Sequence, residues 1–208
     1  MVVRSDNISA LNTAGIQAMW DYGINAVLDL RSGQEIARFP SPFEPADFGP
    51  HYLHVPLVDD ALAEELTRTP STPQRYQMML DRRQEAIGRI VTTIARVEEP
   101  LVFHCFAGKD RTGLVAAMLL SAAGVKPDVI AADYAETDQH LAERYEEWLA
   151  AAPADRVEAM RDELRCPPEW MLGVLDHLDR TWGGAEPYLT AAGVEPQDLL
   201  RVKAKLTG

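Results

Sequence analysis

The chain has 208 residues, of which 47% are hydrophobic and 25% are charged, as in ordinary soluble globular proteins. Its formal net charge of −12 argues against non-specific nucleic-acid binding and against electrostatic adhesion to an anionic membrane. No apolar run reaches the roughly 18 residues that a membrane span needs, and no apolar secretory segment follows Met1, so we expect a cytoplasmic protein without stable membrane insertion. Export by a route without a cleaved signal would leave no mark in the sequence.

The cysteine and histidine content gives no indication of a disulfide framework or a metal site. Two cysteines, Cys105 and Cys166, are too few to form a disulfide framework that would stabilise the fold. The five histidines form neither a His-x-x-x-His nor a Cys-x-x-Cys pattern. We therefore expect no metal and no other cofactor, and we expect Cys166 to be an unpaired thiol. A redox partnership with Cys105 stays open as an alternative.

The first part of the chain predicts helices alternating with strands. A helix is predicted over 14–22, with Gly23 as its stop. The apolar run 26–30 predicts a buried strand. The Pro- and Gly-containing stretch Ser32–Pro50 predicts a loop, and the β-preferring residues of His51–Leu57 predict a short strand.

The middle of the chain predicts one long helix, then a strand and a second apolar helix. The long helix is predicted from Pro73 to Val97, with an apolar stripe along one side. The apolar residues 101–103 predict a strand. A helix dense in Leu, Val and Ala is predicted over 112–123, closed by Gly124.

These elements predict an α/β fold with a small parallel or mixed sheet flanked by helices. Residues 1–208 are expected to form a single domain, with the sheet core in 1–125 and a helical part in 126–208. The length suits one core of this size.

The chemistry is concentrated in a cysteine and an arginine separated by five residues, between the last predicted strand and the helix that follows. Cys105 falls at the carboxyl edge of the sheet, which is where ligands usually bind in open α/β folds. Arg111 falls in the first turn of the helix. The backbone amides between them can form a concave nest, to which the helix dipole adds partial positive charge. Such a cup fits a phosphate dianion.

Cys105 and Arg111 have complementary roles in this interpretation. The amides and the helix N-terminus favour the Cys105 thiolate, a nucleophile able to attack phosphorus and form a covalent intermediate. The planar fork of Arg111 can bind two phosphate oxygens and follow them into the transition state.

The neighbouring residues are expected to support these two. Gly108 lets the backbone approach the phosphate, and Gly113 lets the helix pack tightly. Thr112 is placed to hydrogen-bond the leaving sulfur when water attacks the intermediate. His104 is expected to orient the loop without exchanging protons with the substrate.

The ten residues from His104 to Gly113 resemble the Cys-x5-Arg loop of the protein tyrosine phosphatase superfamily, and more narrowly the atypical bacterial tyrosine/serine phosphatases. Members of that group act on phosphotyrosine, sometimes on phosphoserine or phosphothreonine, and often on phosphoinositides. Further similar stretches are Arg4-Ser5, Asp29-Leu30-Arg31-Ser32 with Glu35, Asp133-Tyr134, and Trp182-Gly183 to Tyr188-Leu189.

Two features depart from related phosphatases. The family's N-terminal Asn-Phe-Arg-Asp-Leu-Gly-Gly-like segment is not found, which indicates a short variant or a truncated start. There is also no Trp-Pro-Asp acid loop of the kind used by animal tyrosine phosphatases.

The resemblance also implies the phosphate-binding residues and a general acid. The phosphate is expected to contact Phe106, Ala107, Gly108, Lys109 and Arg111. The leaving group needs a proton, which a positioned aspartate commonly supplies. Asp110 is the first choice, and Asp59 and Asp60 are the rival acids.

Other functions fit this loop less well than a phosphatase does. A P-loop nucleotide hydrolase is excluded, because Asp110 stands where a Mg²⁺-binding Ser or Thr is needed. A rhodanese-type sulfurtransferase usually has a shorter loop, and a phosphate-binding pseudoenzyme usually lacks the Cys or the Arg. Phosphotyrosine in a protein is the preferred substrate, with dual specificity or phosphoinositides as the alternative, and the oligomeric state is left open.

Overall fold

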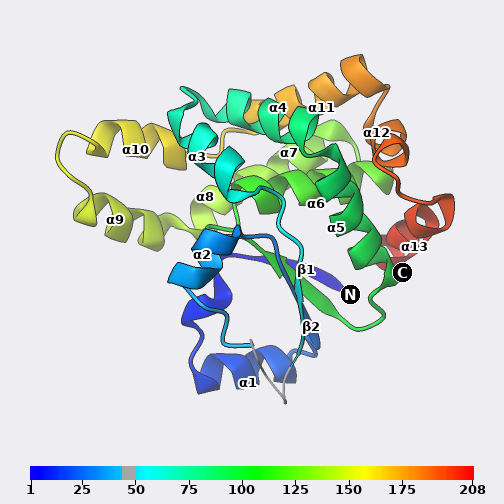
Figure 1. Ribbon diagram of the computed structural model, residues 1–208, viewed down its shortest axis with the longest axis horizontal. Helices are drawn as coiled ribbons and strands as arrows, with labels where there is room; N and C mark the ends of the chain where they lie inside the picture. Colours follow the sequence, from blue (N-terminus) through cyan, green and yellow to red (C-terminus); the bar gives the residue numbers. More distant parts are fainter. Residues whose placement is uncertain (44–49) are drawn as a thin grey trace.

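The fold is built on a sheet of four parallel strands, seen in a computed structural model that describes residues 1–43 and 50–208 (Figure 1). The strand order is β1-β4-β2-β3. The strands are β1 (Val2–Ser5), β2 (Ala26–Asp29), β3 (His51–His54) and β4 (Leu101–His104). Since every strand pair is parallel, the α/β prediction is confirmed in its parallel form. The carboxyl ends of β1, β2 and β4 meet at one edge, where Ser5 and Asp29 both pair in register with His104.

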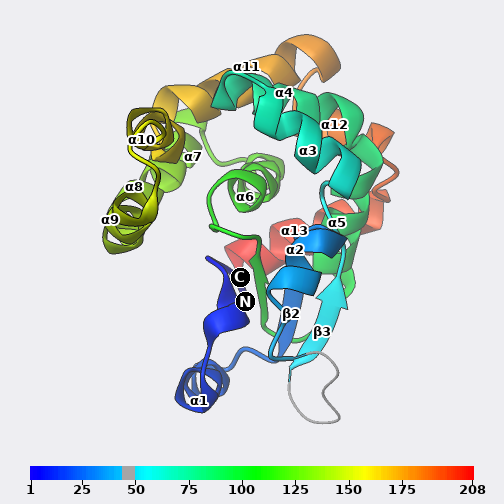
Figure 2. The ribbon, with the colours of Figure 1, turned by 60° about the vertical axis from the view of Figure 1, so that its left-hand side comes forward.

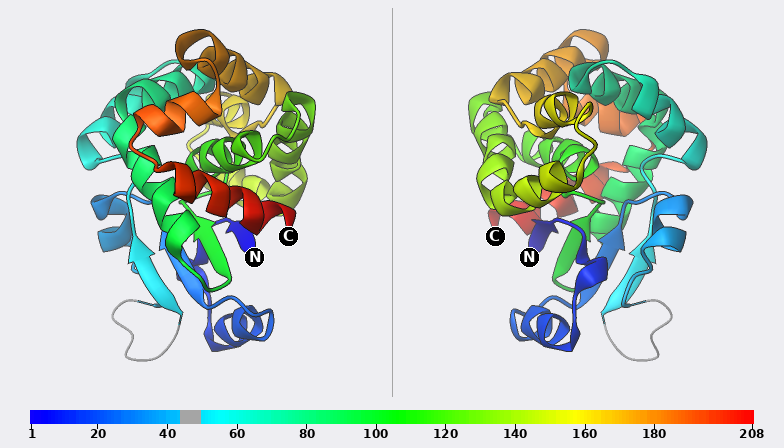
Figure 3. Two further views of the ribbon diagram at one scale, coloured as in Figure 1. Left: turned by 90° about the vertical axis from the view of Figure 1, so that its right-hand side faces the viewer. Right: turned by 90° about the vertical axis from the view of Figure 1, so that its left-hand side faces the viewer.

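The two faces of the sheet bury different cores, because successive strand residues point to opposite sides. Leu28 and Phe103 belong to the main core, which also contains the buried residues of α5, α6 and α13. Val27 and Val102 belong to a smaller core against α1. Helix α1 lies at one end of the molecule and α11 and α12 at the other (Figure 3).

Helix α6 occupies the centre of the helical layer, end-on in Figure 2 with α3, α4, α11 and α7 arranged around it. Residues 112–119 of α6 are all buried, as expected for a helix that is apolar on every side. The burial fixes the start of α6 against the edge of the sheet.

Helices separate the four strands, and the remaining helices follow β4. They are the 3-10 turn η1 (Ile8–Ala10) and α1 (Thr13–Asp21), α2 (Gly33–Arg38), α3 (Asp60–Arg68), α4 (Thr72–Arg82), α5 (Gln84–Arg96), α6 (Asp110–Ala122), α7 (Pro127–Ala135), α8 (Thr137–His140), α9 (Ala142–Ala151), α10 (Val157–Leu164), α11 (Pro168–Trp182), α12 (Ala185–Ala191) and α13 (Pro196–Thr207). Among the described residues, no helix is both long and apolar enough to cross a bilayer.

The prediction of one helix from Pro73 to Val97 is wrong. The backbone leaves the helical path at Arg83 (φ −122°, ψ 25°), which separates α4 from α5. The Arg83 side chain donates to the carbonyl of Leu57 at 2.9 Å and to the carboxylate of Asp59 at 2.6 Å. These are contacts with a distant segment, so the apolar periodicity within the helices gave no sign of the break.

The predicted loop Ser32–Pro50 is also partly wrong, because it contains α2. The helix begins with a capping box, in which Ser32 and Glu35 satisfy each other's backbone amides. Residues 44–49 of the predicted loop lie outside the described part of the chain.

Candidate active site

The loop of Cys105 to Lys109 connects β4 to α6 at the carboxyl edge of the sheet, where the sequence predicts it. Cys105 is only 2% exposed. Asp110 and Arg111 form the first turn of α6, and Lys109 occupies the N-cap position without a side-chain cap. The first amides of α6 are therefore not occupied by a capping side chain, and the positive end of the helix dipole lies at the loop.

Gly108 is required by the contact between this loop and β1. Its φ is +65°, a value that L-residues rarely adopt. A Cβ atom at this position would come within 2.5 Å of the Ser5 carbonyl oxygen and 2.7 Å of the Asp6 Cα. The close approach that the structure shows at Gly108 is to the protein backbone, and the expected approach to a phosphate stays a prediction.

The guanidinium of Arg111 is held edge to edge by Glu35 from α2. Nη1 donates to Oε2 at 2.5 Å, and Nη2 donates to Oε1 at 2.7 Å. Burial disfavours the Glu35 carboxylate, but the hydrogen bonds and charge of Arg111 outweigh burial and hold the pKa of Glu35 below its ordinary value. Two parallel charged hydrogen bonds fix the direction of the fork and leave Nε for another oxygen.

A buried polar cluster at the carboxyl ends of β2 and β4 contacts the start of the loop. Asp29 and Arg31 are both fully buried, and Arg31 donates from Nη2 to Oδ2 of Asp29 at 2.6 Å. Tyr52 donates to the same oxygen at 3.0 Å. His104 donates from Nδ1 to the Cys105 carbonyl at 3.0 Å, and its Nε2 lies 3.6 Å from Asp29. The cluster ties the end of β2 to the backbone of Cys105.

The Asp110 carboxylate is bound through a single oxygen. Its Oδ1 accepts a hydrogen bond from the Tyr76 hydroxyl at 2.6 Å and lies 3.3 Å from Lys109 Nζ. Burial opposes ionisation, but the charge of Lys109 and the Tyr76 hydrogen bond hold the pKa of Asp110 below its ordinary value.

Lys109 is almost completely buried, with its ammonium group already engaged. It donates to the Glu163 carbonyl and lies 5.5 Å from the centre of the Trp170 ring. In this conformation the Lys109 ammonium group lies next to the Asp110 carboxylate.

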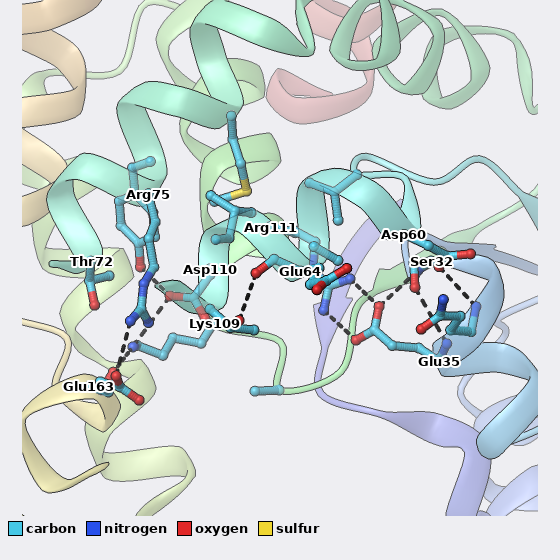
Figure 4. A pocket seen from close by; sticks show the side chains of 18 of the residues that line it. Ser32, Glu35, Asp60, Glu64, Thr72, Arg75, Lys109, Asp110, Arg111 and Glu163 are labelled. Atoms are coloured by element: carbon cyan, nitrogen blue, oxygen red, sulfur yellow. Dashed lines mark hydrogen bonds and ion pairs between the residues drawn. The ribbon is translucent and has the colours of Figure 1, made fainter. Parts of the chain in front are cut away.

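A pocket of about 610 Å³ opens beside the loop and brings several of the candidate residues together (Figure 4). Ala107, Lys109, Asp110 and Arg111 line it, as does the rival acid Asp60. The other rival, Asp59, instead caps α3 by accepting from the Leu62 amide at 2.8 Å. Other lining residues, which the sequence analysis missed, include Arg75, Tyr76 and Glu163.

The remaining predicted residues pack around the loop. Thr112 is fully buried, and its hydroxyl has no hydrogen-bond partner among the described residues. Gly113 makes room for Tyr134, whose ring would lie 3.0 Å from a Cβ there, as the prediction of tight packing requires. Phe106 stacks on Trp148 at 6.2 Å between ring centres. Across the described residues, no group of three His, Cys, Asp or Glu side chains is placed to hold a metal ion.

Comparison with known proteins agrees with this arrangement. A family model described as "Tyrosine phosphatase family" matches residues 1–208. A "Triple specificity protein phosphatase PtpB" of Mycobacterium tuberculosis is 28% identical over 249 aligned positions, which cover 99% of this chain and 90% of that protein. A "Tyrosine-protein phosphatase" of Nostoc commune is 30% identical over 218 positions, which cover 98% of this chain and 73% of that protein.

A small parallel sheet with a Cys-x5-Arg loop at its carboxyl edge is the arrangement of a tyrosine-phosphatase-type hydrolase of phosphoric monoesters. The chain belongs to the tyrosine phosphatase family, and its relatives place it with the atypical bacterial members.

Proposed function

We propose that this phosphatase hydrolyses phosphotyrosine in proteins through a cysteinyl-phosphate intermediate, with residues 1–208 acting as one unit. The observation that supports the proposal most directly is the position of Cys105 and Arg111. They flank a loop whose amides lead into the N-terminus of α6, and Glu35 fixes the direction of the arginine fork. Amides, dipole and guanidinium together supply positive charge where the phosphoryl oxygens develop negative charge.

In the first step, the Cys105 thiolate attacks phosphorus. The phosphorus–sulfur bond forms as the bond to the leaving oxygen breaks, and that oxygen takes the proton of Asp110. The backbone amides from Phe106 to Lys109 and the Nε edge of Arg111 hold the equatorial oxygens. The low pKa of Asp110 in the free protein is compatible with this role, because a bound phosphate adds negative charge beside the carboxylate and raises the pKa again.

In the second step, water attacks the phosphorus of the intermediate. Asp110 takes a proton from that water, inorganic phosphate forms, and the phosphorus–sulfur bond breaks to restore the thiolate. The unpartnered hydroxyl of Thr112 is available to donate a hydrogen bond to the departing sulfur.

Dual specificity or phosphoinositide hydrolysis is the second candidate. The printed name of the mycobacterial relative, a triple specificity protein phosphatase, favours it. The burial of Lys109 argues against direct contact with a second phosphate, because its ammonium is held by the Glu163 carbonyl and by Asp110.

The test is phosphate release from an aryl phosphate, phosphotyrosine and phosphoserine peptides and short-chain phosphoinositides, with Cys105→Ser as the blank. We expect the phosphotyrosine peptide to give the highest kcat/KM, and all turnover to vanish in the variant. Highest turnover with phosphoserine peptides or phosphoinositides would replace the protein-tyrosine assignment by the second candidate. Binding of phosphate without turnover by the freshly reduced protein would indicate a pseudoenzyme.

A further inference from the structure

Two buried tyrosines connect Asp110 to the helices that surround α6. Tyr76 of α4 and Tyr134 of α7 are 0% and 1% exposed. Their hydroxyl oxygens lie 2.7 Å apart, and their rings meet edge to face. The Tyr76 hydroxyl also donates to the Asp110 carboxylate, at 2.6 Å. Two phenolic groups in an apolar layer have a high desolvation cost unless they are hydrogen-bonded.

The direction of this chain of hydrogen bonds follows from the number of protons available. An ionised carboxylate only accepts, so the single hydroxyl proton of Tyr76 is donated to Asp110. The second hydrogen bond of Tyr76 must then be one that it accepts, which makes Tyr134 the donor. The order is therefore Tyr134 to Tyr76 to Asp110.

Both polar contacts that Asp110 makes with side chains of the described residues fall on the same oxygen. Tyr76 and Lys109 converge on Oδ1, at 2.6 and 3.3 Å. The other oxygen, Oδ2, is left to carry a mobile proton. Gly113 belongs to the same arrangement, since a Cβ there would lie 3.0 Å from the Tyr134 ring.

We propose that Tyr76, oriented by Tyr134, is a positioning residue for the general acid–base function of Asp110. It holds Oδ1, so that Oδ2 gives its proton to the leaving oxygen in the first step and takes a proton from water in the second. The inference rests on the proposed function, and it adds two residues that act through Asp110.

Other charged groups also act on Asp110, so the contribution of Tyr76 must be isolated by experiment. The titratable and charged groups that face Asp110 or line its pocket come from several elements. They are Lys109 of the loop, Arg111 of α6, Glu35 of α2, Asp60 and Glu64 of α3, Arg75 and Tyr76 of α4, Tyr134 of α7, Tyr145 of α9 and Glu163 of α10. Removing one hydroxyl leaves all the charges in place.

The experiment compares wild type with Tyr76→Phe on two substrates, 4-nitrophenyl phosphate and phenyl phosphate, across pH. Phenolate leaves less readily than 4-nitrophenolate and depends more on the acid. We expect kcat/KM of the variant, which reports the first step, to fall about 10-fold on phenyl phosphate but less than about threefold on 4-nitrophenyl phosphate. Hydrolysis of the intermediate is common to both substrates, so any loss in that step should be the same for the two. The alkaline limb of the kcat profile should move to higher pH, because the carboxylate loses a donor that stabilised its charged form.

A double-mutant cycle separates positioning from general damage. In an Asp110→Asn background, Tyr76→Phe should have no further effect on kcat, since the group through which it acts is gone. Tyr188→Phe is the matched control: this tyrosine is also fully buried, but its hydroxyl donates to the Leu80 carbonyl at 2.8 Å, away from the loop. We expect wild-type profiles from it.

The outcomes of the proposed function and of this inference are distinct. Hydrolysis by wild type and none by Cys105→Ser tests the function. With that established, a Tyr76→Phe variant with the wild-type pH limb and leaving-group dependence would overturn the inference. So would equal losses in the wild-type and Asp110→Asn backgrounds. If circular dichroism shows that Tyr76→Phe is unfolded, Tyr134→Phe takes its place: a smaller shift in the same direction is expected, and an unchanged profile would overturn the inference.

Discussion

The carboxylate of Glu35 and the guanidinium of Arg111 form a bidentate pair, at 2.5 and 2.7 Å, between two helices that start 77 residues apart in the chain (residues 33 and 110). The capping box that starts α2 places Glu35, since the same side chain accepts from the Ser32 amide at 2.8 Å. A local helix-start motif therefore also orients the arginine fork of the proposed phosphate site.

Glu35→Gln should lower kcat/KM about 10-fold or more, because a neutral amide cannot accept both hydrogen bonds of the guanidinium. The measurement is steady-state hydrolysis of 4-nitrophenyl phosphate. Glu65→Gln is the control, since Glu65 pairs with Arg82 on the exposed side of α3 and should leave kcat/KM within about twofold. Equal rates for wild type and Glu35→Gln would show that Arg111 needs no fixed partner.

The buried ion pair of Asp29 and Arg31 should matter for stability far more than an exposed pair. Asp29→Asn leaves the guanidinium buried without its counter-charge, and we expect the free energy of unfolding in urea to fall by about 3–5 kcal/mol. Asp59→Asn is a matched comparison: asparagine can still cap α3, and only the partly exposed pair with Arg83 is lost. That loss should not exceed about 1 kcal/mol. Similar losses in the two variants would contradict this ranking.

Acid should destabilise the protein in two steps. Burial lowers the pKa of His104, although the charge of Asp29 opposes this shift. As pH falls, His104 therefore takes up its proton in the unfolded chain before it does so in the folded protein. Stability should then fall as pH drops below about 6.5, the ordinary histidine value. The pKa of Asp29 is also lowered, because Arg31 outweighs burial, so its contribution is present above the ordinary aspartate value and is lost at lower pH.

Urea unfolding from pH 8 down to about pH 2 covers both steps, because the Asp29 contribution is lost only below the ordinary aspartate value. His104→Asn should flatten the decline that begins near pH 6.5, whatever its effect on stability at pH 8. A decline of the same steepness in this variant would assign the proton uptake to another group.

The sequence predicted those parts of the fold and site that depend on neighbouring residues. The apolar runs gave β2, β4 and α6, and the spacing of Cys105 and Arg111 placed the loop correctly between strand and helix. Tyr76 was missed because it reaches Asp110 across 34 residues by the packing of α4, and nothing near Tyr76 in the chain marks it. The short, partly buried strand β1 was missed because its four residues carry no distinct periodicity.

Gly108→Ala should disrupt the loop by a clash as well as by backbone strain. Gly124→Ala is the matched control, since Gly124 has a φ of +83° but nothing within 4 Å of its Cβ position. Positive φ should cost each variant about 1 kcal/mol of unfolding free energy. Only Gly108→Ala meets the Ser5 carbonyl, so only this variant should lose more stability and most of its phosphatase activity. Wild-type activity in Gly108→Ala would show that the loop and β1 can move apart without harm.

Cys166 should take no part in turnover or in a redox partnership with Cys105. It is fully buried, and burial raises its pKa to about 12, so it remains a thiol at neutral pH. Iodoacetamide at pH 7.5 should therefore modify Cys105 alone, more slowly when inorganic phosphate is present, as read by peptide mass spectrometry. Cys166→Ala should hydrolyse 4-nitrophenyl phosphate within about twofold of the wild-type rate. A Cys105–Cys166 disulfide in peroxide-treated protein would contradict this, because the Cys166 thiol would then have to leave its contacts with Tyr145 and the Leu164 carbonyl.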